Sequence, residues 1–261
     1  MAELIVPDPG AALLLLLASG AVFAGFVDAV VGGGGLVQIP LLFGVFPNAT
    51  PAVLFGTNKV ASVVGTASAA VQYARRIPLD WRMVLPAIPS ALLFSWLGAR
   101  SVAHFPPDLL RPIVVALLVG VAFHTFRHKE FGIGPDISPS HPALRATVTS
   151  AILGFYDGFF GPGTGSFLVF AYVRILGLDF LRASAFTKLT NVATNVAAIH
   201  FFAGHGAVLW LAAAIMATAN LAGALLGSYM ALRRGAPFIR RVFLYAVCTL
   251  IAKLSWDIAT H

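Results

Sequence analysis

The chain has 261 residues, of which 59% are hydrophobic and only 10% are charged, and its formal net charge is +7. Soluble domains carry about 25% charged residues, so this chain has too few polar side chains to cover the surface of a soluble globule. The lysines and arginines gather in short loops between apolar runs, which is typical of membrane topology signals rather than of nucleic-acid binding. The composition therefore predicts an all-α polytopic membrane protein and excludes nucleic acid as a partner.

The apolar runs approach the ~20 residues that a helix needs to cross a bilayer. The first half is predicted to form a helical hairpin over residues 11–46, followed by helices 51–73, 81–102 and 109–126. A polar linker, residues 128–142, is expected on the cytoplasmic side. The second half is predicted to form a hairpin over residues 143–178, followed by helices 180–203, 208–232 and 238–258. This gives about eight long helices and two short ones.

The two halves are copies of one another, because a shift of 129 residues aligns them without a gap. The shift places Asp28 on Asp157 and Lys59 on Lys188, and it also matches glycines, tryptophans and arginines. Two unrelated apolar sequences would share Leu, Val and Ala by chance, but they would not readily share Asp, Lys, Trp and Arg. The sequence therefore predicts two repeats, residues 1–127 and 143–261.

Loop charges predict that the repeats are inverted. The loop before Trp81 reads "RRIPLD", whereas its counterpart before Trp210 reads "GHGAVL" and carries no Lys or Arg. When one of two equivalent loops is basic and the other is not, the positive-inside rule places the two loops on opposite sides of the membrane. This assignment puts both chain termini outside the cell, and it makes the two hairpins dip in from opposite faces. Whether each hairpin arm crosses fully or turns back midway stays open at this stage.

Each hairpin turns at a glycine-rich break, "GGGG" in the first and "GPGTG" in the second. Paired broken helices are typical of secondary transporters, whose substrates bind where the breaks meet. Free N–H groups at such a break can hold an anion in a medium without water; the alternative is that the glycines only permit tight turns or close packing. The candidate substrate-binding positions are Gly32, Gly33, Gly34, Gly35, Gly161, Gly163, Thr164 and Gly165.

Four ionisable side chains lie inside the predicted membrane segments. Asp28 and Asp157 stand one helical turn before the breaks, where they are candidates for proton coupling or for capping the following short helix. Lys59 and Lys188 lie within helices and need counter-ions, which the two aspartates can supply. The lysines either form structural pairs with them or contribute to an electropositive pocket for an anion. Neighbouring candidates on the same helix faces are Asn58, Ser62 and Thr66 in the first copy, and Asn191 and Asn195 in the second.

The motifs "FVDAVVGGGGL" and "GFYDGFFGPGTGSF…KLTN" resemble the TauE/SafE family of bacterial membrane transporters, and they are most similar to its YfcA-like branch. The resemblance extends over nearly the whole chain. It implies an inner-membrane carrier of sulfite, organosulfonates or related sulfur-containing anions. It also implies binding roles for the residues that match the family motifs: Asp28, Gly32–Gly35, Asn58, Lys59, Asp157, Gly161, Lys188, Asn191 and Asn195.

The sequence thus predicts a secondary active transporter of a small anion that works by alternating access. An anion channel is the main alternative, and an intramembrane aspartyl protease is a more distant one because no GxGD motif occurs. No P-loop is present, no metal-ligand spacing is found among the seven histidines, and no cofactor is expected. The expected partners are the anionic substrate, the lipid bilayer and protons, with a homodimer as a candidate assembly.

Overall fold

The computed structural model describes residues 10–101 and 139–260, with side chains described up to residue 245. All regular structure in these ranges is helical, which confirms the all-α class. The helices are α1 (Ala11–Val31), α2 (Gly34–Val45), α3 (Pro51–Ala74), α4 (Trp81–Ser101), α6 (Pro142–Phe159), α7 (Thr164–Leu176), α8 (Phe180–Gly204) and α9 (Trp210–Thr260). The predicted helix 109–126 and residues 128–138 of the predicted linker lie outside the described residues.

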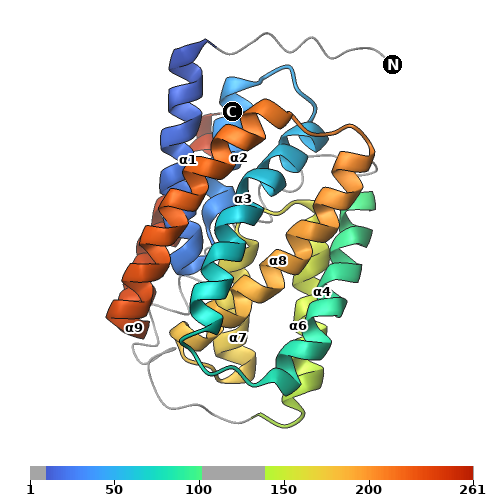
Figure 1. Cartoon of the computed structure of the whole chain (residues 1–261), viewed down its shortest axis with the longest axis vertical. Coiled ribbons are helices and arrows are strands. Elements are labelled where there is room, and N and C mark those ends of the chain that lie inside the picture. The colour runs from blue at the N-terminus through green and yellow to red at the C-terminus, as the bar shows by residue number, and fades with distance from the viewer. Residues whose placement is uncertain (1–9, 102–138, 261) are drawn as a thin grey trace.

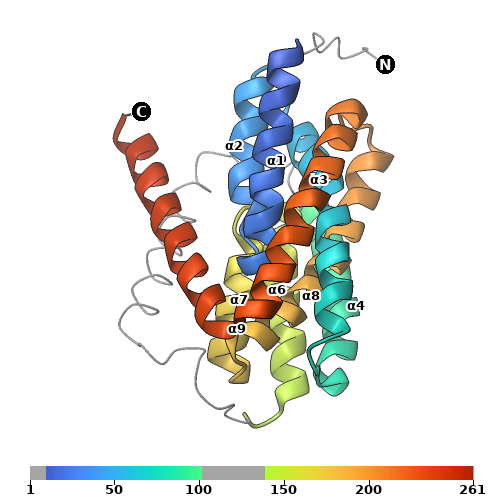
Figure 2. The same ribbon diagram turned by 60° about the vertical axis from the view of Figure 1, so that its left-hand side comes forward.

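The helix breaks fall where the glycines are. Gly32 ends α1 in the left-handed conformation, with φ of 77°, and α7 follows Gly163, whose φ is 82°. Only glycine adopts such angles without steric cost. Helix α9 is interrupted at Gly235 (φ 70°, ψ −168°), two residues before Pro237. The predicted helices 208–232 and 238–258 are therefore the two arms of α9, which fold back at this kink (Figure 2).

The two hairpins enter the bundle from opposite ends. Figure 1 shows α1 and α2 in one half of the molecule and α6 and α7 in the other, with the breaks near the middle. Helices α3 and α8 pass side by side through the centre (Figures 1 and 2). Each hairpin turns back inside the bundle. The repeat boundaries and the side of the membrane that each end faces stay predictions.

Close helix crossings join the two halves of the chain. Helix α1 packs on α9, and α4 packs on α6. A Cβ added at Gly98 would collide with the carbonyl oxygen of Phe155, and one added at Gly227 would lie 2.6 Å from that of Phe26. Small residues let membrane helices approach to backbone contact. Gly98 and Gly227 are 129 residues apart, as are Phe26 and Phe155, so the two crossings correspond to each other under the sequence shift.

The outer faces of the bundle are apolar. Large hydrophobic side chains are exposed along α1, α4, α6 and α9, among them Leu15, Leu85, Ile152 and Leu226. Three of the described helices are long and apolar enough to cross a membrane: Ala11–Val31, Trp81–Ser101 and Trp210–Tyr245. Helices α3 and α8 have 24 and 25 residues, but they carry the buried polar side chains of the centre. The chain is a multi-pass membrane protein.

Apolar clusters occupy the two ends of the bundle, with polar side chains between them. One cluster includes Tyr73, Met83 and Phe186, and the other includes Leu54 and Phe202. Along α3 and α8, the stretch between these clusters holds the buried polar residues Asn58, Lys59, Ser62, Thr66, Thr187, Lys188, Asn191, Thr194 and Asn195. Buried polar groups in a membrane need partners or ligands, so this central layer is the place to look for function.

Candidate functional site

The two glycine breaks touch each other at the centre of the bundle. A Cβ added at Gly32 would collide with the backbone of Gly165, and one added at Gly165 would collide with Gly32. The hydroxyl of Ser166 donates a hydrogen bond of 3.1 Å to the carbonyl oxygen of Val31, which ties the start of α7 to the end of α1. The predicted meeting of the two tips is therefore present as a backbone contact.

The tip of the first hairpin is held by a lysine from the second half of the chain. The Lys188 ammonium donates to the backbone carbonyl oxygen of Asp28, and it lies 3.4 Å from the Oδ2 atom of the same residue. That Oδ2 atom also accepts a hydrogen bond of 3.0 Å from the hydroxyl of Thr66. Lys188 is fully buried. A cation at the C-terminal end of α1 is favourable, because the helix dipole is negative there.

The tip of the second hairpin is held in the corresponding way by a lysine from the first half. The Lys59 ammonium lies 2.6 Å from Oδ2 of Asp157, and both side chains are buried. The same ammonium lies against the second break, since a Cβ added at Gly161 would be 3.3 Å from it. Lys59 therefore reaches both the carboxylate and the backbone of the opposite hairpin.

The two ion pairs are crossed. Each lysine sits on the long helix that follows one hairpin and pairs with the aspartate of the other hairpin. The four charges sum to zero, so none is left uncompensated in the low-dielectric interior. An anion that enters this region meets two ammonium groups that are already neutralised, and it has to compete with a carboxylate for one of them.

The carboxylates do not cap the short helices, which was one of the two roles considered for them. Helix α2 begins at Gly34 and α7 at Thr164, and neither has a side-chain hydrogen bond at its N-cap. Asp28 and Asp157 bind the lysines instead. The positive ends of the α2 and α7 dipoles therefore face the centre without a capping side chain, which is a favourable environment for an anion.

The remaining predicted residues surround the breaks. A Cβ added at Gly35 would lie 3.7 Å from the Asn58 amide nitrogen and 3.8 Å from the Gly161 carbonyl oxygen. The hydroxyl of Thr164 donates to Gly161 in its own turn, at 2.8 Å. Three more predicted glycines have close neighbours: Gly33 lies near the Ser166 hydroxyl, Gly34 packs against Asp28, and Gly163 packs against Leu36. The predicted amides Asn191 and Asn195 are buried on α8.

Some polar atoms in this layer have no hydrogen-bond partner among the described residues. They include the Oδ1 atoms of Asn58 and Asn191 and the hydroxyl of Thr187. All three side chains are more than nine-tenths buried. Unpaired buried polar atoms cost free energy, so these three atoms are candidate contacts for water or a ligand. No cluster of three His, Cys, Asp or Glu side chains suited to a metal ion occurs in the described part of the chain.

Sequence reasoning missed Gln38. This fully buried residue of α2 accepts a hydrogen bond of 3.0 Å from the hydroxyl of Ser62 through its Oε1 atom, and its Nε2 atom has no partner among the described residues. The available signal was a polar amide inside the apolar run "GLVQIP". Gln38 adds an N–H donor to the wall formed by α2 and α3.

Comparison with known protein families matches residues 17–254 to the family described as "Sulfite exporter TauE/SafE". This chain belongs to the TauE/SafE family. The chain is 35% identical over 257 residues to the "Probable membrane transporter protein ORF9" of Sinorhizobium sp., covering 95% of this chain and 94% of the relative. The TauE/SafE assignment makes the chain a membrane transporter, as the motifs predicted.

Two other relatives of this TauE/SafE transporter carry similar names. The chain is 31% identical over 237 residues to the "Probable membrane transporter protein YfcA" of Escherichia coli strain K12, covering 91% of this chain and 87% of the relative. It is 30% identical over 250 residues to a "Probable membrane transporter protein" of Haemophilus influenzae, covering 96% and 97% of the two chains. No solved structure matches this chain significantly.

Replacing Gly32 by alanine is expected to destabilise the protein by at least about 2 kcal/mol, because a side chain at a positive φ costs about 1–3 kcal/mol and the added Cβ collides with Gly165. Gly44→Ala is the matched control, since a Cβ at Gly44 meets nothing within 4 Å and alanine favours the helix. Thermal unfolding in detergent measures both variants. Equal unfolding temperatures would show that the two tips do not pack as described.

Proposed function

We propose that this TauE/SafE protein is a secondary active carrier of a small anion, with sulfite or an organosulfonate as the first candidates, and that it works by alternating access. The carrying observation is the pair of buried lysines, each ion-paired with the aspartate of the opposite hairpin where two uncapped helix breaks touch. The description of the family as sulfite exporters supports the choice of substrate class.

The chemistry of the centre suits an oxyanion. The Lys59 ammonium supplies a positive charge, the Gln38 amide supplies an N–H donor, and α2 and α7 begin at the centre without capping side chains. Burial strengthens each of these interactions relative to water. Glycine at the breaks allows a ligand to approach the backbone closely. A sulfite or sulfonate group carries three oxygen atoms that accept hydrogen bonds and spread the negative charge over the surrounding donors.

Binding of the anion is proposed to replace a carboxylate. Asp157 is the counter-ion of Lys59, with its Oδ2 atom 2.6 Å from the ammonium. When Asp157 takes up a proton, its attraction for the ammonium falls, and the substrate anion takes the position of the counter-charge. Anion and proton then occupy the site together and leave it together, which couples their movement. Asp28 offers a second site of the same kind, with Lys188 as its partner.

The arrangement of the helices supports alternating access. The hairpins enter from opposite ends, and the crossings of α1 with α9 and of α4 with α6 correspond under the 129-residue shift. Inverted repeats of this kind exchange conformations when a carrier opens to the other side. The protein is proposed to lie in the bacterial inner membrane with both termini outside, because the basic loops are then cytoplasmic.

The test is transport by the purified protein in liposomes, preceded by a thermal-shift screen of sulfite, thiosulfate, taurine, sulfoacetate and carboxylates. We expect one sulfur oxyanion or sulfonate to stabilise the protein and to show saturable counterflow. Stabilisation by none of these anions, combined with no uptake, would contradict the substrate class. Conductance without saturable counterflow would identify a channel instead of a carrier.

A further inference from the structure

One end of the bundle is closed by direct backbone contact. The loop before α9 lies on the N-terminal part of α3, where the N–H of Leu209 donates a hydrogen bond of 2.9 Å to the Thr57 hydroxyl. A Cβ added at Gly56 would collide with the carbonyl oxygen of Ala207. Ala207 and Val208 are each only 8% exposed. At this end, here called the sealed end, the described part of the loop is in direct contact with α3 at Gly56 and Thr57.

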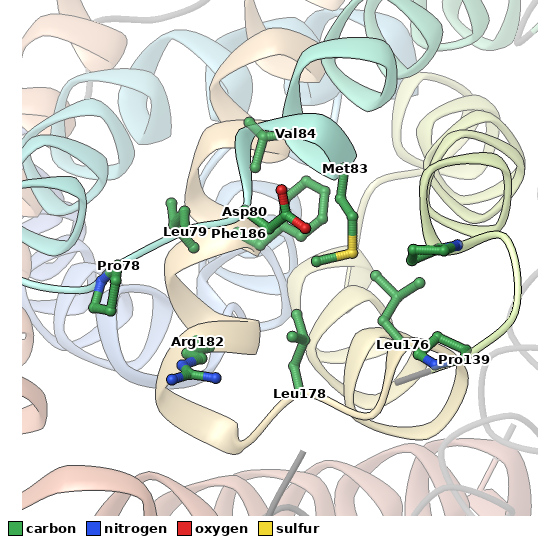
Figure 3. A pocket seen from close by; sticks show the side chains of 11 residues that line it. Pro78, Leu79, Asp80, Met83, Val84, Pro139, Leu176, Leu178, Arg182 and Phe186 are labelled. Atoms are coloured by element: carbon green, nitrogen blue, oxygen red, sulfur yellow. The ribbon is translucent and has the colours of Figure 1, made fainter. Parts of the chain in front are cut away.

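The corresponding loop at the other end stands away from α8. A cavity of ≈ 240 Å³ separates them, and Figure 3 shows Leu79, Asp80, Met83, Arg182 and Phe186 around it. Pro78 and Asp80 are exposed, whereas their counterparts 129 residues later, Ala207 and Leu209, are buried and half-buried. Leu79 is half-buried, whereas its counterpart Val208 is buried. This end is called the open end below.

The difference between the ends follows from two residues on each helix. The positions equivalent to Gly56 and Thr57 are Ala185 and Phe186. At the sealed end, Gly56 admits the loop carbonyl and Thr57 binds the loop N–H. At the open end, the Phe186 ring is stacked on Tyr172 with centroids 4.4 Å apart, and Ala185 and Phe186 offer the loop neither the glycine nor the hydroxyl that hold it at the sealed end. The asymmetry is thus built into the side chains of α3 and α8.

The open end is also the basic end. Exposed arginines lie on the segments around the cavity: Arg75, Arg76, Arg82, Arg145 and Arg174. Arg182 lines the cavity itself and lies 3.6 Å from Asp179. Asp80, the other charged lining residue, accepts a hydrogen bond from the backbone of Arg82 at 3.0 Å. A concave surface surrounded by an excess of one sign of charge concentrates small ions of the opposite sign.

We propose that this cavity is the vestibule through which the small anion enters, in a state of the carrier that is sealed at the Gly56 end. The proposal rests on the proposed function, but accessibility of the two ends does not depend on which anion is carried. Transport therefore opens the contact between Thr57 and Leu209 in the other half of the cycle. The vestibule is the first binding place for the anion, ahead of the central lysines.

The test uses single-cysteine variants, since Cys248 is the one cysteine of the chain and Cys248→Ser removes it. Met83→Cys reports on the vestibule, and Ala212→Cys is its matched control 129 residues later at the sealed end; both wild-type residues are at most 9% exposed. Both ends of the protein meet water in detergent. A sulfonatoethyl methanethiosulfonate reagent should label Met83→Cys at least about tenfold faster than Ala212→Cys, because the reactivity of a thiol depends on its access to the reagent. Leu79→Cys and Val208→Cys form a second pair.

Equal labelling rates within both pairs, or faster labelling at the sealed end, would overturn the proposal. A further variant tests the seal: Gly56→Ala adds a Cβ that collides with Ala207, so it should raise labelling of Ala212→Cys and leave Met83→Cys unchanged. No effect of Gly56→Ala on Ala212→Cys would contradict the described closure.

The sign of the reagent tests the ligand class. The rate of each reagent with Met83→Cys is first divided by the rate of the same reagent with a small thiol in solution. After this correction, the negatively charged sulfonate reagent should react faster than its positively charged trimethylammonium counterpart. Arg182→Gln should reduce this preference. An equal or reversed preference would overturn the entry of anions here, even if the accessibility difference between the ends persists. If this labelling pattern is observed but the purified wild-type protein transports no anion in liposomes, the carrier function is contradicted instead.

Discussion

Lys59→Met is expected to abolish saturable anion transport. Truncating one partner of a buried charge pair costs about 2–5 kcal/mol. Applied to the contact between the Lys59 ammonium and the bound anion, this cost lowers the affinity for the anion at least about thirtyfold. Here the loss has two parts, because the variant removes the ammonium that faces the second break and leaves Asp157 buried without its counter-charge. Uptake into liposomes measures the first part and thermal unfolding measures the second.

A double variant separates these two parts. Replacing a buried ion pair by apolar residues of similar size is often neutral for stability, so Lys59→Met combined with Asp157→Leu should recover most of the unfolding temperature that the single variant loses. Transport should stay absent, because no ammonium remains at this tip. Arg100→Met controls for the loss of one positive charge at an exposed site, in the last turn of α4 and away from the cavity. A double variant that transports the anion would restrict Lys59 to a structural role.

The helices and their breaks were predictable because each depends on local sequence. Apolar runs of sufficient length predict helices, and glycine predicts the positive φ that ends α1 at Gly32. The kink of α9 at Gly235 lies between the two predicted helices for the same reason. Whether the hairpins crossed the bundle was not predictable, since a 21-residue helix such as α1 is long enough either to span a bilayer or to turn back beneath its surface.

The pairing of the central charges was only partly predictable. The spacing along the chain indicated that Asp28, Asp157, Lys59 and Lys188 lie in the membrane and that the aspartates can serve as counter-ions. It did not show which lysine meets which aspartate. That depends on the contact between the hairpin tips at Gly32 and Gly165, which joins distant parts of the chain. The capping role considered for the aspartates is not seen, since neither short helix has a side-chain cap and both carboxylates pair with lysines.

Gln38 and Thr164 show the limit of reading polar residues from a motif. Gln38 lies in the second arm of the first hairpin, outside the glycine motif, and only its hydrogen bond with Ser62 places it in the central layer. Thr164 lies within the second motif and stays a predicted substrate contact, and the structure adds that its hydroxyl donates to Gly161 in the same turn. Side-chain partners depend on packing between helices, which residue spacing alone does not specify.

Asp157→Asn is expected to separate anion exchange from proton-driven accumulation. The asparagine amide has nearly the size of the carboxylate, and its oxygen is an acceptor for the Lys59 ammonium, so the tip should keep its structure. The side chain no longer gains or loses a proton, and the ammonium is no longer neutralised. The anion should bind without a proton, and counterflow at equal pH on both sides should persist.

Accumulation driven by an imposed pH gradient should then be lost, because no proton moves with the anion at this pair. Parallel liposome assays of counterflow and of gradient-driven uptake measure the two activities on the same preparation. Asp28→Asn is the matched variant at the repeat-equivalent position, where Thr66 and Lys188 share the carboxylate oxygen. If Asp157→Asn still accumulates the anion and Asp28→Asn does not, coupling belongs to the Lys188 pair. If both variants accumulate it, proton transfer at these aspartates does not drive transport.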